Sequence, residues 1–392
     1  MSKWDMVRLG DVCEFINGDR GVNYPSSNDF IEKGIPFINA GHLKNDSISF
    51  DNMNYIPEQK YNQLGSGKVR NGDFLYCLRG SLGKQAIVNN MSKGAIASSL
   101  VILRPKSINI GFLGYCMKTN IVFEQLVKTN NGSSQPNLSA SSVKNFIIPL
   151  PPLPVQQKIA EVLDRASALI VKRKAQIAKL DLLVKSQFIK KFGDPHEMGK
   201  WTCKHIEDVA SVTVGVVIKP AQYYTEEPDG IRTFRSLNVG EMHVRDDDWV
   251  YFTPRGHKSN NKSELKEGDV LVVRSGYPGT SCVVPANYEG CNAIDIIIAR
   301  PNKAVVNPVY MCAFTNAAHG MNQIKTKTGG AAQQHFNVGA YKNLTIALPP
   351  LPLQKRFADF VRAADKLRFE MRQGLNKLEL MYKSLMQKCF SG

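Results

Sequence analysis

The sequence lacks the long apolar segments and paired cysteines that mark several classes of protein. No apolar run approaches the ~20 residues that cross a bilayer, and the first residues, MSKWDMVRLGDV, hold no apolar signal core. We therefore expect a soluble, cytoplasmic protein with no membrane partner. The 8 cysteines include no C-x-x-C pair. The sequence thus predicts neither a thiolate zinc site nor a disulfide framework.

Motifs for catalysis and cofactor binding are missing or incomplete. The segment GSGKV at 65–69 lacks the first glycine and the final Ser or Thr of a phosphate-binding loop. Asn307-Pro308-Val309-Tyr310 lacks the second proline of an amino-methyltransferase signature, and we interpret it as a helix cap followed by proline in the first turn. The histidines form no H-x-x-x-H or H-E-x-x-H pair. We predict no catalytic residue, no metal site and no cofactor bound by this chain.

The composition is that of a folded, basic protein. The chain has 392 residues, of which 43% are hydrophobic and 21% charged, so we expect at least two domains. Lys plus Arg number 50 against 34 for Asp plus Glu, a net charge of +16. Such an excess favours a polyanionic partner, nucleic acid first and acidic surfaces next.

The chain contains an internal repeat, with an offset that stays between 196 and 198 residues. Register is kept over several separate segments, so the repeat indicates two copies of one structural unit. Three matched pairs are VRNGDFLYCLRGSLG at 69–83 with LKEGDVLVVRSGYPG at 265–279, GAIASSLVILRP at 94–105 with GCNAIDIIIARP at 290–301, and IPLPPLPVQQ at 148–157 with IALPPLPLQK at 346–355.

Each copy changes its hydrophobic period near a proline-rich segment. Before PLPPLP, short β-branched and aromatic runs alternate with Gly, Asn and Pro turns, which predicts a mixed, mainly β domain. After it, apolar residues recur every three or four positions, which predicts one long helix. The predicted boundaries are 1–152 and 194–352 for the β domains, and 153–193 and 353–392 for the helices.

The two amphipathic helices have too little neighbouring sequence to bury their apolar stripes locally. We expect them to form an antiparallel, coiled-coil-like pair, so that the α+β chain closes with pseudo-two-fold symmetry and the helices separate the β domains. A rival interpretation makes each helix a cap on its own domain. The stripe residues that we predict for the helix faces, and for partner binding, are Ile159, Leu163, Ile170, Ile177, Leu180, Val184, Phe188, Phe357, Val361, Leu367, Leu375, Leu378 and Leu385.

Two loops recur in both copies and carry side chains suited to nucleic-acid contact. Arginine can bond a guanine edge or a phosphate, and Gln and Asn suit an adenine edge. Structural turns with satisfied side chains are the alternative for any single residue. The predicted DNA-binding residues in and around the loops are Arg79, Gly80, Ser81, Lys84, Ser133, Ser134, Gln135 and Asn137 in the first copy, Arg274, Ser275, Tyr277, Gln333, Gln334, His335 and Asn337 in the second, and, as supporting contacts, Lys44, Arg235, Lys325 and Lys327.

The loops differ between the copies, with LGKQ against YPGT and SSQPN against AAQQH. Similar frames with different side chains predict an asymmetric target in two parts, since a palindrome would need identical halves. A non-catalytic scaffold that bridges protein or RNA partners is the alternative function.

Taken together, these motifs resemble the specificity subunit of a Type I restriction–modification system. The resemblance rests on the strand after Gly-Asp with its R-G-S loop, on GSSQPN and GAAQQH, on the helix entries PLPPLPVQQKIAEVLD and LPPLPLQKRFADFV, and on LDLLVKSQFIKKFGDP. It implies two target-recognition domains, each for one half of a bipartite DNA site, with a helical spacer that sets the spacing between the half-sites.

The resemblance also implies the partners. They are double-stranded DNA, two methyltransferase subunits docked on the helices, and restriction or motor subunits. The subunit itself is then non-catalytic within a DNA adenine methyltransferase and ATP-dependent endonuclease complex. S-adenosylmethionine, ATP and Mg are expected in the partner subunits.

The excess positive charge lies mainly on the predicted helices. Residues 153–193 carry 9 basic and 3 acidic side chains, and residues 353–392 carry 9 and 4. Residues 194–352 carry 16 of each. Base recognition must therefore depend on a few loop residues and not on the overall charge of the β domains.

Overall fold

The computed structural model describes residues 4–129, 137–194, 200–327 and 335–391. The chain divides into two compact units, with residues 1–174 and 374–392 in unit 1 and residues 175–373 in unit 2. The long helices α6 (Leu153–Phe192) and α12 (Leu351–Ser391) each contribute to both units. Among the described residues, no helix combines the length and the apolar character needed to span a membrane.

Unit 1 combines short strands with short helices. The strands are β1 (Met6–Arg8), β2 (Cys13–Asn17), β3 (Ile35–Ile38), β4 (Leu43–Lys44), β5 (Ser47–Ile48), β6 (Asn54–Ile56), β7 (Phe74–Cys77), β8 (Gln85–Ile87), β9 (Ala95–Ile96), β10 (Leu100–Pro105) and β11 (Ile147–Pro149). The shorter helices are α1 (Leu9–Val12), α2 (Glu58–Gln63), α3 (Ile110–Cys116), α4 (Asn120–Thr129) and α5 (Ala140–Lys144).

Unit 2 repeats the order of elements of unit 1, apart from β4 and β5. Its strands are β12 (Thr202–His205), β13 (Ala210–Val214), β14 (Ile231–Phe234), β15 (Val250–Phe252), β16 (Val270–Val273), β17 (Ser281–Val283), β18 (Asn292–Ala293), β19 (Ile296–Pro301) and β20 (Thr345–Leu348). Its shorter helices are α7 (Ile206–Val209), α8 (Pro254–Ser259), α9 (Pro308–Asn316), α10 (Ala318–Lys327) and α11 (Val338–Lys342).

The larger sheets have the same topology in both units, and unit 1 has in addition the β4–β5 hairpin. An antiparallel four-stranded sheet has the order β2-β10-β7-β8 in unit 1 and β13-β19-β16-β17 in unit 2. A three-stranded sheet, β6-β3-β9 or β15-β14-β18, contains one parallel pair in each unit. The sheets are therefore mixed and mainly antiparallel, as the sequence predicted.

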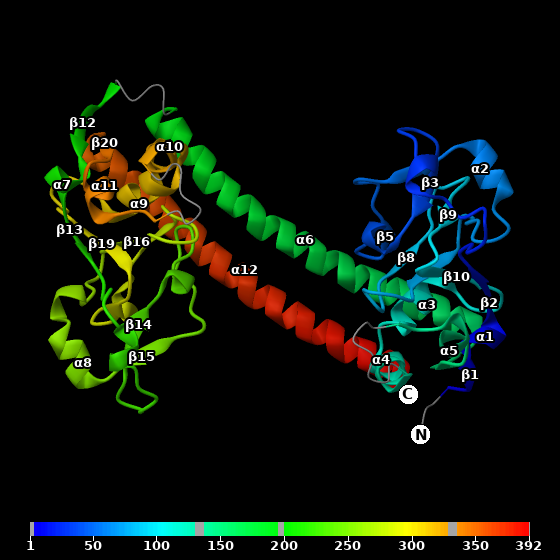
Figure 1. Ribbon diagram of the computed structural model, residues 1–392. Helices are drawn as coiled ribbons and strands as arrows, with labels where there is room; N and C mark the ends of the chain where they lie inside the picture. Colours follow the sequence, from blue (N-terminus) through cyan, green and yellow to red (C-terminus); the bar gives the residue numbers. More distant parts are fainter. Residues whose placement is uncertain (1–3, 130–136, 195–199, 328–334, 392) are drawn as a thin grey trace. The chain divides into compact units, whose positions relative to one another are not determined.

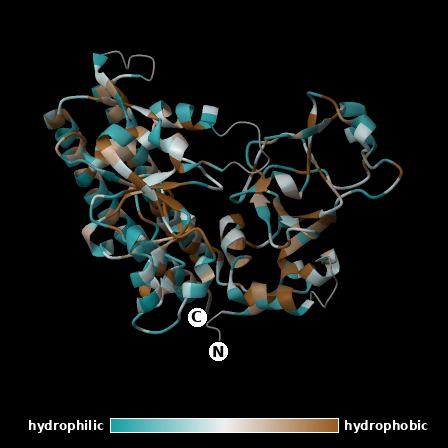
Figure 2. Ribbon diagram, turned by 60° about the vertical axis from the view of Figure 1, so that its left-hand side comes forward, coloured by the Kyte–Doolittle hydropathy of each residue, from teal (hydrophilic) through white to brown (hydrophobic). Residues whose placement is uncertain are grey.

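The central strands of the four-stranded sheets are buried on both faces. In β7, Phe74 and Tyr76 contribute to a cluster with α3, whereas Leu75 and Cys77 contribute to a second cluster on the other face. This explains why the strand sequence is continuously apolar and does not alternate. Figure 1 shows the same arrangement in unit 2, where β13, β19 and β16 lie side by side with α9 and α11 close by. In Figure 2 the hydrophobic colour gathers on the inner strands, and the peripheral loops are mostly hydrophilic.

The Gly-Asp motif before the central strand has a structural role in both units. The Asp73 side chain is almost fully buried and pairs with Arg104, with Nε and Oδ1 2.7 Å apart. Asp269 and Arg300 form the equivalent pair, with Nη2 and Oδ2 2.7 Å apart. Each carboxylate also accepts a hydrogen bond from the backbone N–H three residues earlier. The pair fixes the turn that leads into the strand.

The helix entries are fixed by a buried glutamine. Gln156 accepts a hydrogen bond from the backbone N–H of Asn109, the residue that caps α3, and donates one to a carbonyl of the proline segment. Gln354 makes the equivalent bonds in unit 2, where Asn307 caps α9 and Pro308 is its first residue. The predicted cap at Asn307 is thus confirmed.

Within each unit, the portions of α6 and α12 run antiparallel to each other. In unit 1, Lys174 pairs with Glu379 at 2.8 Å. In unit 2, Arg368 pairs with Asp181 at 2.8 Å, and the ring of Phe357 lies 5.5 Å from that of Phe188. The predicted antiparallel pairing is therefore confirmed inside each unit.

The structure shows how deeply each residue of the predicted helix stripe is buried. Leu163, Val184, Phe188, Phe357 and Val361 are buried in the core of their own unit. These side chains therefore stabilise the units, and their contact with a partner stays a prediction. Most of the other predicted stripe residues are half-buried, and Leu367 is exposed. Their contact with a partner remains a prediction. The half-buried residues are Ile159, Ile170, Ile177, Leu180, Leu375, Leu378 and Leu385.

Candidate nucleic-acid interface

The two loops that we predicted from the sequence meet in each unit. In unit 1, the backbone of Arg79, after β7, forms an antiparallel bridge with Asn137, before α5. In unit 2, Ser275, after β16, forms the same bridge with His335, before α11. Residues that lie far apart in sequence therefore form one surface site in each unit.

In unit 1 the loop after β7 presents polar groups to solvent. Arg79, Gly80, Ser81 and Lys84 are all exposed, and so is Asn137. Gly80 has a φ of 76°, a left-handed conformation that favours glycine. The site therefore presents an arginine, a lysine, a serine hydroxyl and an amide.

Other predicted contacts of unit 1 lie elsewhere or are not described. Lys44 lies on the β4–β5 hairpin, where its Nζ pairs with Asp51 at 3.1 Å. Ser133, Ser134 and Gln135 lie outside the described residues.

In unit 2 the loop after β16 is also exposed but differs chemically. Ser275 is exposed, and 83% of the Tyr277 side chain is accessible. Gly276 has a φ of 85°, as in unit 1. Gln333 and Gln334 lie outside the described residues.

Arg274 differs from Arg79, because it is buried and fully engaged. Its Nε donates to the carbonyl of Phe336 at 3.2 Å, its Nη1 lies 2.5 Å from Asp295 Oδ1, and its Nη2 lies 2.6 Å from His335 Nε2. The structural counterpart of Arg79 is Ser275, since each makes the same backbone bridge. Arg274 therefore fixes the two loops to each other, and a direct DNA contact by it stays a prediction.

The remaining predicted residues of unit 2 occupy several positions. Asn337 caps α11, because its side-chain oxygen accepts from the backbone N–H of Ala340 at 2.7 Å. Lys325 and Lys327 are exposed in the last turn of α10. Arg235 pairs with Asp248 at 3.0 Å. Their contact with DNA stays a prediction.

Sequence reasoning missed Asp295, which accepts the hydrogen bond from Arg274. Asp295 has a φ of 48° and directly precedes β19. A signal was present, because the offset of 196 that aligns Gly80 with Gly276 also aligns Leu78 with Arg274 and Ser99 with Asp295. The first copy has an uncharged pair at these two positions, and the second copy has an ion pair there.

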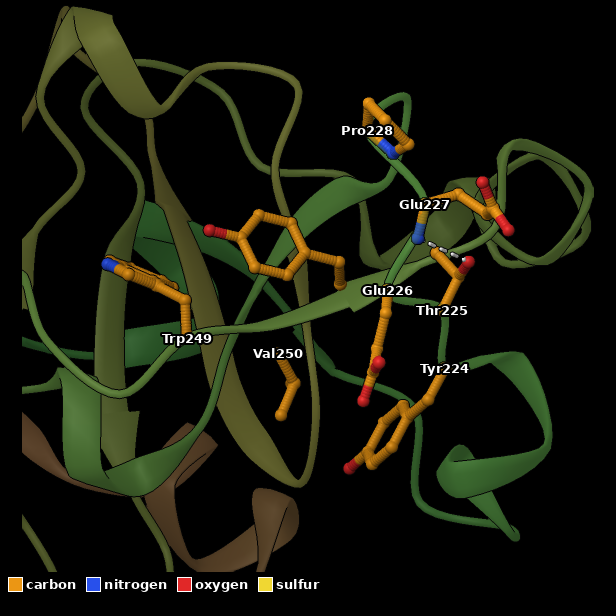
Figure 3. A pocket seen from close by; sticks show the side chains of 8 residues that line it. Tyr224, Thr225, Glu226, Glu227, Pro228, Trp249 and Val250 are labelled. Carbon is orange, nitrogen blue, oxygen red and sulfur yellow. Dashed lines mark hydrogen bonds between the residues drawn. The ribbon is translucent and has the colours of Figure 1, made fainter.

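A separate cavity of about 760 Å³ lies on the three-stranded sheet of unit 2. Figure 3 shows Tyr224, Trp249 and two glutamates, Glu226 and Glu227, around it. Glu227 donates its backbone N–H to the hydroxyl of Thr225 at 3.1 Å. Carboxylates at the rim repel phosphate, so this cavity is not suited to the DNA backbone.

Burial raises the pKa of several groups in the units. The pKa of Cys13 rises to about 12 and that of Cys312 to about 12, since burial penalises the thiolate.

In the described ranges, no group of three or more His, Cys, Asp or Glu side chains could hold a metal ion.

Known proteins resemble this chain over nearly its whole length. It is 23% identical to the type I restriction enzyme EcoKI specificity subunit of Escherichia coli (strain K12), over 99% of this chain and 89% of that protein. It is 21% identical to the type I restriction enzyme MjaVIII specificity subunit of Methanocaldococcus jannaschii, over 99% of this chain and 92% of that protein.

Two solved structures share the fold. One is a chain from a structure concerned with complex assembly and conformational transition of the type I R-M system, with a TM-score of 0.63 and 18% identity. It aligns over 99% of this chain and 98% of that chain. The other is a Type I restriction–modification system S subunit from M. genitalium, with a TM-score of 0.59, 14% identity and coverage of 100% and 97%.

The family model for the Type I restriction modification DNA specificity domain matches residues 1–180 and 199–380. Those two matches reproduce the internal repeat and together cover most of the sequence. The chain therefore belongs to the family of Type I restriction–modification DNA specificity subunits.

Proposed function

We propose that each unit recognises one half of an asymmetric, bipartite DNA target. The observation that carries the proposal is the pair of loops that meet in the same way in both units but present different side chains. Arg79 and Asn137 lie at the bridge in unit 1, and Ser275 and His335 lie there in unit 2. Equal frames with unequal contacts suit two different half-sites joined in one target.

The side chains at these sites suit contacts with base edges and phosphates. An exposed arginine such as Arg79 can bond guanine O6 and N7 or a phosphate, and an asparagine such as Asn137 can bond adenine. Lys84, exposed in the same loop, suits a phosphate. These contacts fit double-stranded DNA better than a protein or RNA surface, and the bridging scaffold is not favoured.

We further propose that the chain acts with two methyltransferase subunits and with restriction or motor subunits, in the cytoplasm. Apolar side chains that the units leave exposed along the helices, such as Leu169, Val171, Leu182, Leu380 and Met381, offer contact area for such partners. S-adenosylmethionine, ATP and Mg would then belong to the partners, and this chain would catalyse no step itself.

DNA binding by the complex of this chain with its methyltransferase partner tests the proposal. We expect the affinity for duplex DNA to fall steeply with salt, because phosphate contacts release counterions. We also expect methyl transfer from S-adenosylmethionine by the complex and none by the chain alone. Binding without salt dependence, or methyl transfer by the partner-free chain, would contradict the proposal.

A further inference from the structure

Four side chains of unit 2 form a continuous chain of polar contacts that ends at the surface. Asp295 Oδ1 lies 2.5 Å from Arg274 Nη1, Arg274 Nη2 lies 2.6 Å from His335 Nε2, and His335 Nδ1 lies 2.8 Å from Ser275 Oγ. Arg274 is buried, with 8% of its surface exposed, whereas Ser275 is exposed. The chain therefore connects a buried charge to a surface hydroxyl.

The guanidinium determines which ring nitrogen of His335 carries the proton. Arginine only donates hydrogen bonds and does not lose its proton in proteins. His335 Nε2 must therefore accept from Arg274, which places the imidazole proton on Nδ1. Nδ1 then donates to Ser275 Oγ, so the hydroxyl proton of Ser275 points to another acceptor.

This arrangement differs from a catalytic Ser-His-Asp set. In such a set, a carboxylate accepts from the histidine and leaves the other ring nitrogen free to remove the serine proton. Here Arg274 lies between Asp295 and His335, so the nitrogen next to Ser275 already carries a proton. His335 cannot act as a base towards Ser275, and the contacts orient the hydroxyl without activating it.

Unit 1 provides a comparison at the same place in the fold. In unit 1 Leu100 pairs with Cys77, and in unit 2 Ile296 pairs with Val273. The next residues beyond these pairs are Leu78 and Ser99 in unit 1. They correspond to Arg274 and Asp295 in unit 2. Unit 1 therefore lacks the ion pair at this place. Its surface residue there is Arg79, a side chain that is always a donor.

We propose that Ser275 is held as an outward hydrogen-bond donor and selects an acceptor atom in the second half of the DNA target. Both units then present a donor at the same position of the fold, one from arginine itself and one from a hydroxyl oriented by the ion pair. The acceptor is a base atom, such as purine N7, guanine O6 or thymine O4, or a phosphate oxygen. This inference rests on the proposed function.

A double-mutant cycle on the complex of the full chain with its methyltransferase partner tests the inference. Ser275→Ala removes the donor, and the pair of substitutions Arg274→Leu and Asp295→Ser replaces the ion pair with the residues of unit 1. Ser211→Ala, at an exposed position on β13, is the matched serine control. The probe is a duplex that carries the motif mapped from methylated DNA, and thermal melting confirms that each variant folds.

We expect Ser275→Ala to lower the affinity for the cognate duplex about fivefold, the usual size of one hydrogen bond, and Ser211→Ala to leave it unchanged. In the Arg274→Leu/Asp295→Ser background, Ser275→Ala should cost less than twofold, because the hydroxyl is no longer oriented. A duplex that lacks one base acceptor (7-deazapurine for N7, 2-aminopurine for guanine O6, 5-methylpyrimidin-2-one for thymine O4) and removes the effect of Ser275→Ala identifies a base acceptor. A methylphosphonate duplex that does so identifies a phosphate.

Two results would overturn the inference while leaving the proposed function intact. One is cognate binding by Ser275→Ala equal to that of the unchanged chain. The other is a loss on Ser275→Ala that is the same with and without the Arg274–Asp295 pair. A complex that prefers no duplex over any other would instead contradict the proposed function itself.

Discussion

Phe188 tests most clearly whether the apolar stripe of α6 stabilises unit 2 or serves as a docking face. Only 2% of Phe188 is exposed, and its ring lies 5.0 Å from that of Phe192, 5.5 Å from that of Phe357 and 5.7 Å from that of Tyr310. These rings come from α6, α12 and α9, so Phe188 connects three helices of one core. Its replacement by Ala removes a ring that packs against all three helices.

Truncation of a buried phenylalanine to alanine costs about 4 kcal/mol, because transfer free energy is lost and a cavity remains. For a unit of this size, about 3 °C of melting temperature corresponds to each kcal/mol, so we expect the transition of unit 2 to shift down by about 12 °C. The measurement is thermal or urea unfolding of the chain without any partner. Leu182→Ala on the same helix, where 64% of the side chain is exposed, is the control and should change stability by less than about 0.5 kcal/mol.

Unfolding of Phe188→Ala that matches the unchanged chain would refute this reasoning. If that variant also bound the methyltransferase partner less tightly, Phe188 would have to face outwards. The core of unit 2 would then have been assigned wrongly.

Three further predictions concern stability and thiol reactivity. Asp73→Ala removes a buried carboxylate and its hydrogen bonds to Arg104 and to a backbone N–H, and should cost about 3 kcal/mol; Asp269→Ala should cost a similar amount in unit 2. Two separate urea transitions would show these losses, and an unaffected transition would contradict the structural role of the pair. Gly374→Ala should raise stability by about 1 kcal/mol in the same assay, because alanine has a higher helix propensity than glycine. The new Cβ would meet only the end of an arginine side chain, at 3.4 Å. Destabilisation would indicate a tighter helix contact. Iodoacetamide should modify the exposed Cys203 in the folded chain. It should modify Cys13, which is buried and has a pKa raised to about 12, only after unfolding. Mass spectrometry of digested peptides measures both, and equal labelling before unfolding would contradict the burial of Cys13.

The repeat, the strands and the long helices could be predicted because each depends on local pattern. Glycine and aspartate before a continuous apolar run marked β7 and β16, and the structure shows that the aspartate is held by an arginine about 30 residues later. The helix bounds followed from the change of period, and α6 ends at Phe192 before Gly193, whose φ is 90°. Each of these features depends on residues that are close together in the sequence, so the local pattern is enough to predict it.

The contacts of individual loop residues could not be predicted in the same way. Arg79 and Arg274 look alike in sequence, yet one is exposed and the other is buried with three polar partners. The difference arises from Asp295, which directly precedes β19, and from His335, which bridges Ser275; both reach Arg274 from segments distant in the sequence. Asn337 similarly serves as a helix cap, a role set by where α11 begins.

The central claim is that each unit recognises one half of a split DNA target. Mapping of methylated bases across a genome, in cells that contain this chain and its methyltransferase partner, tests it most directly. We expect a motif with two defined parts and an undefined gap, and exchange of residues 1–152 for those of a relative should change one part only. A continuous motif, or a motif that is unchanged by the exchange, would contradict it.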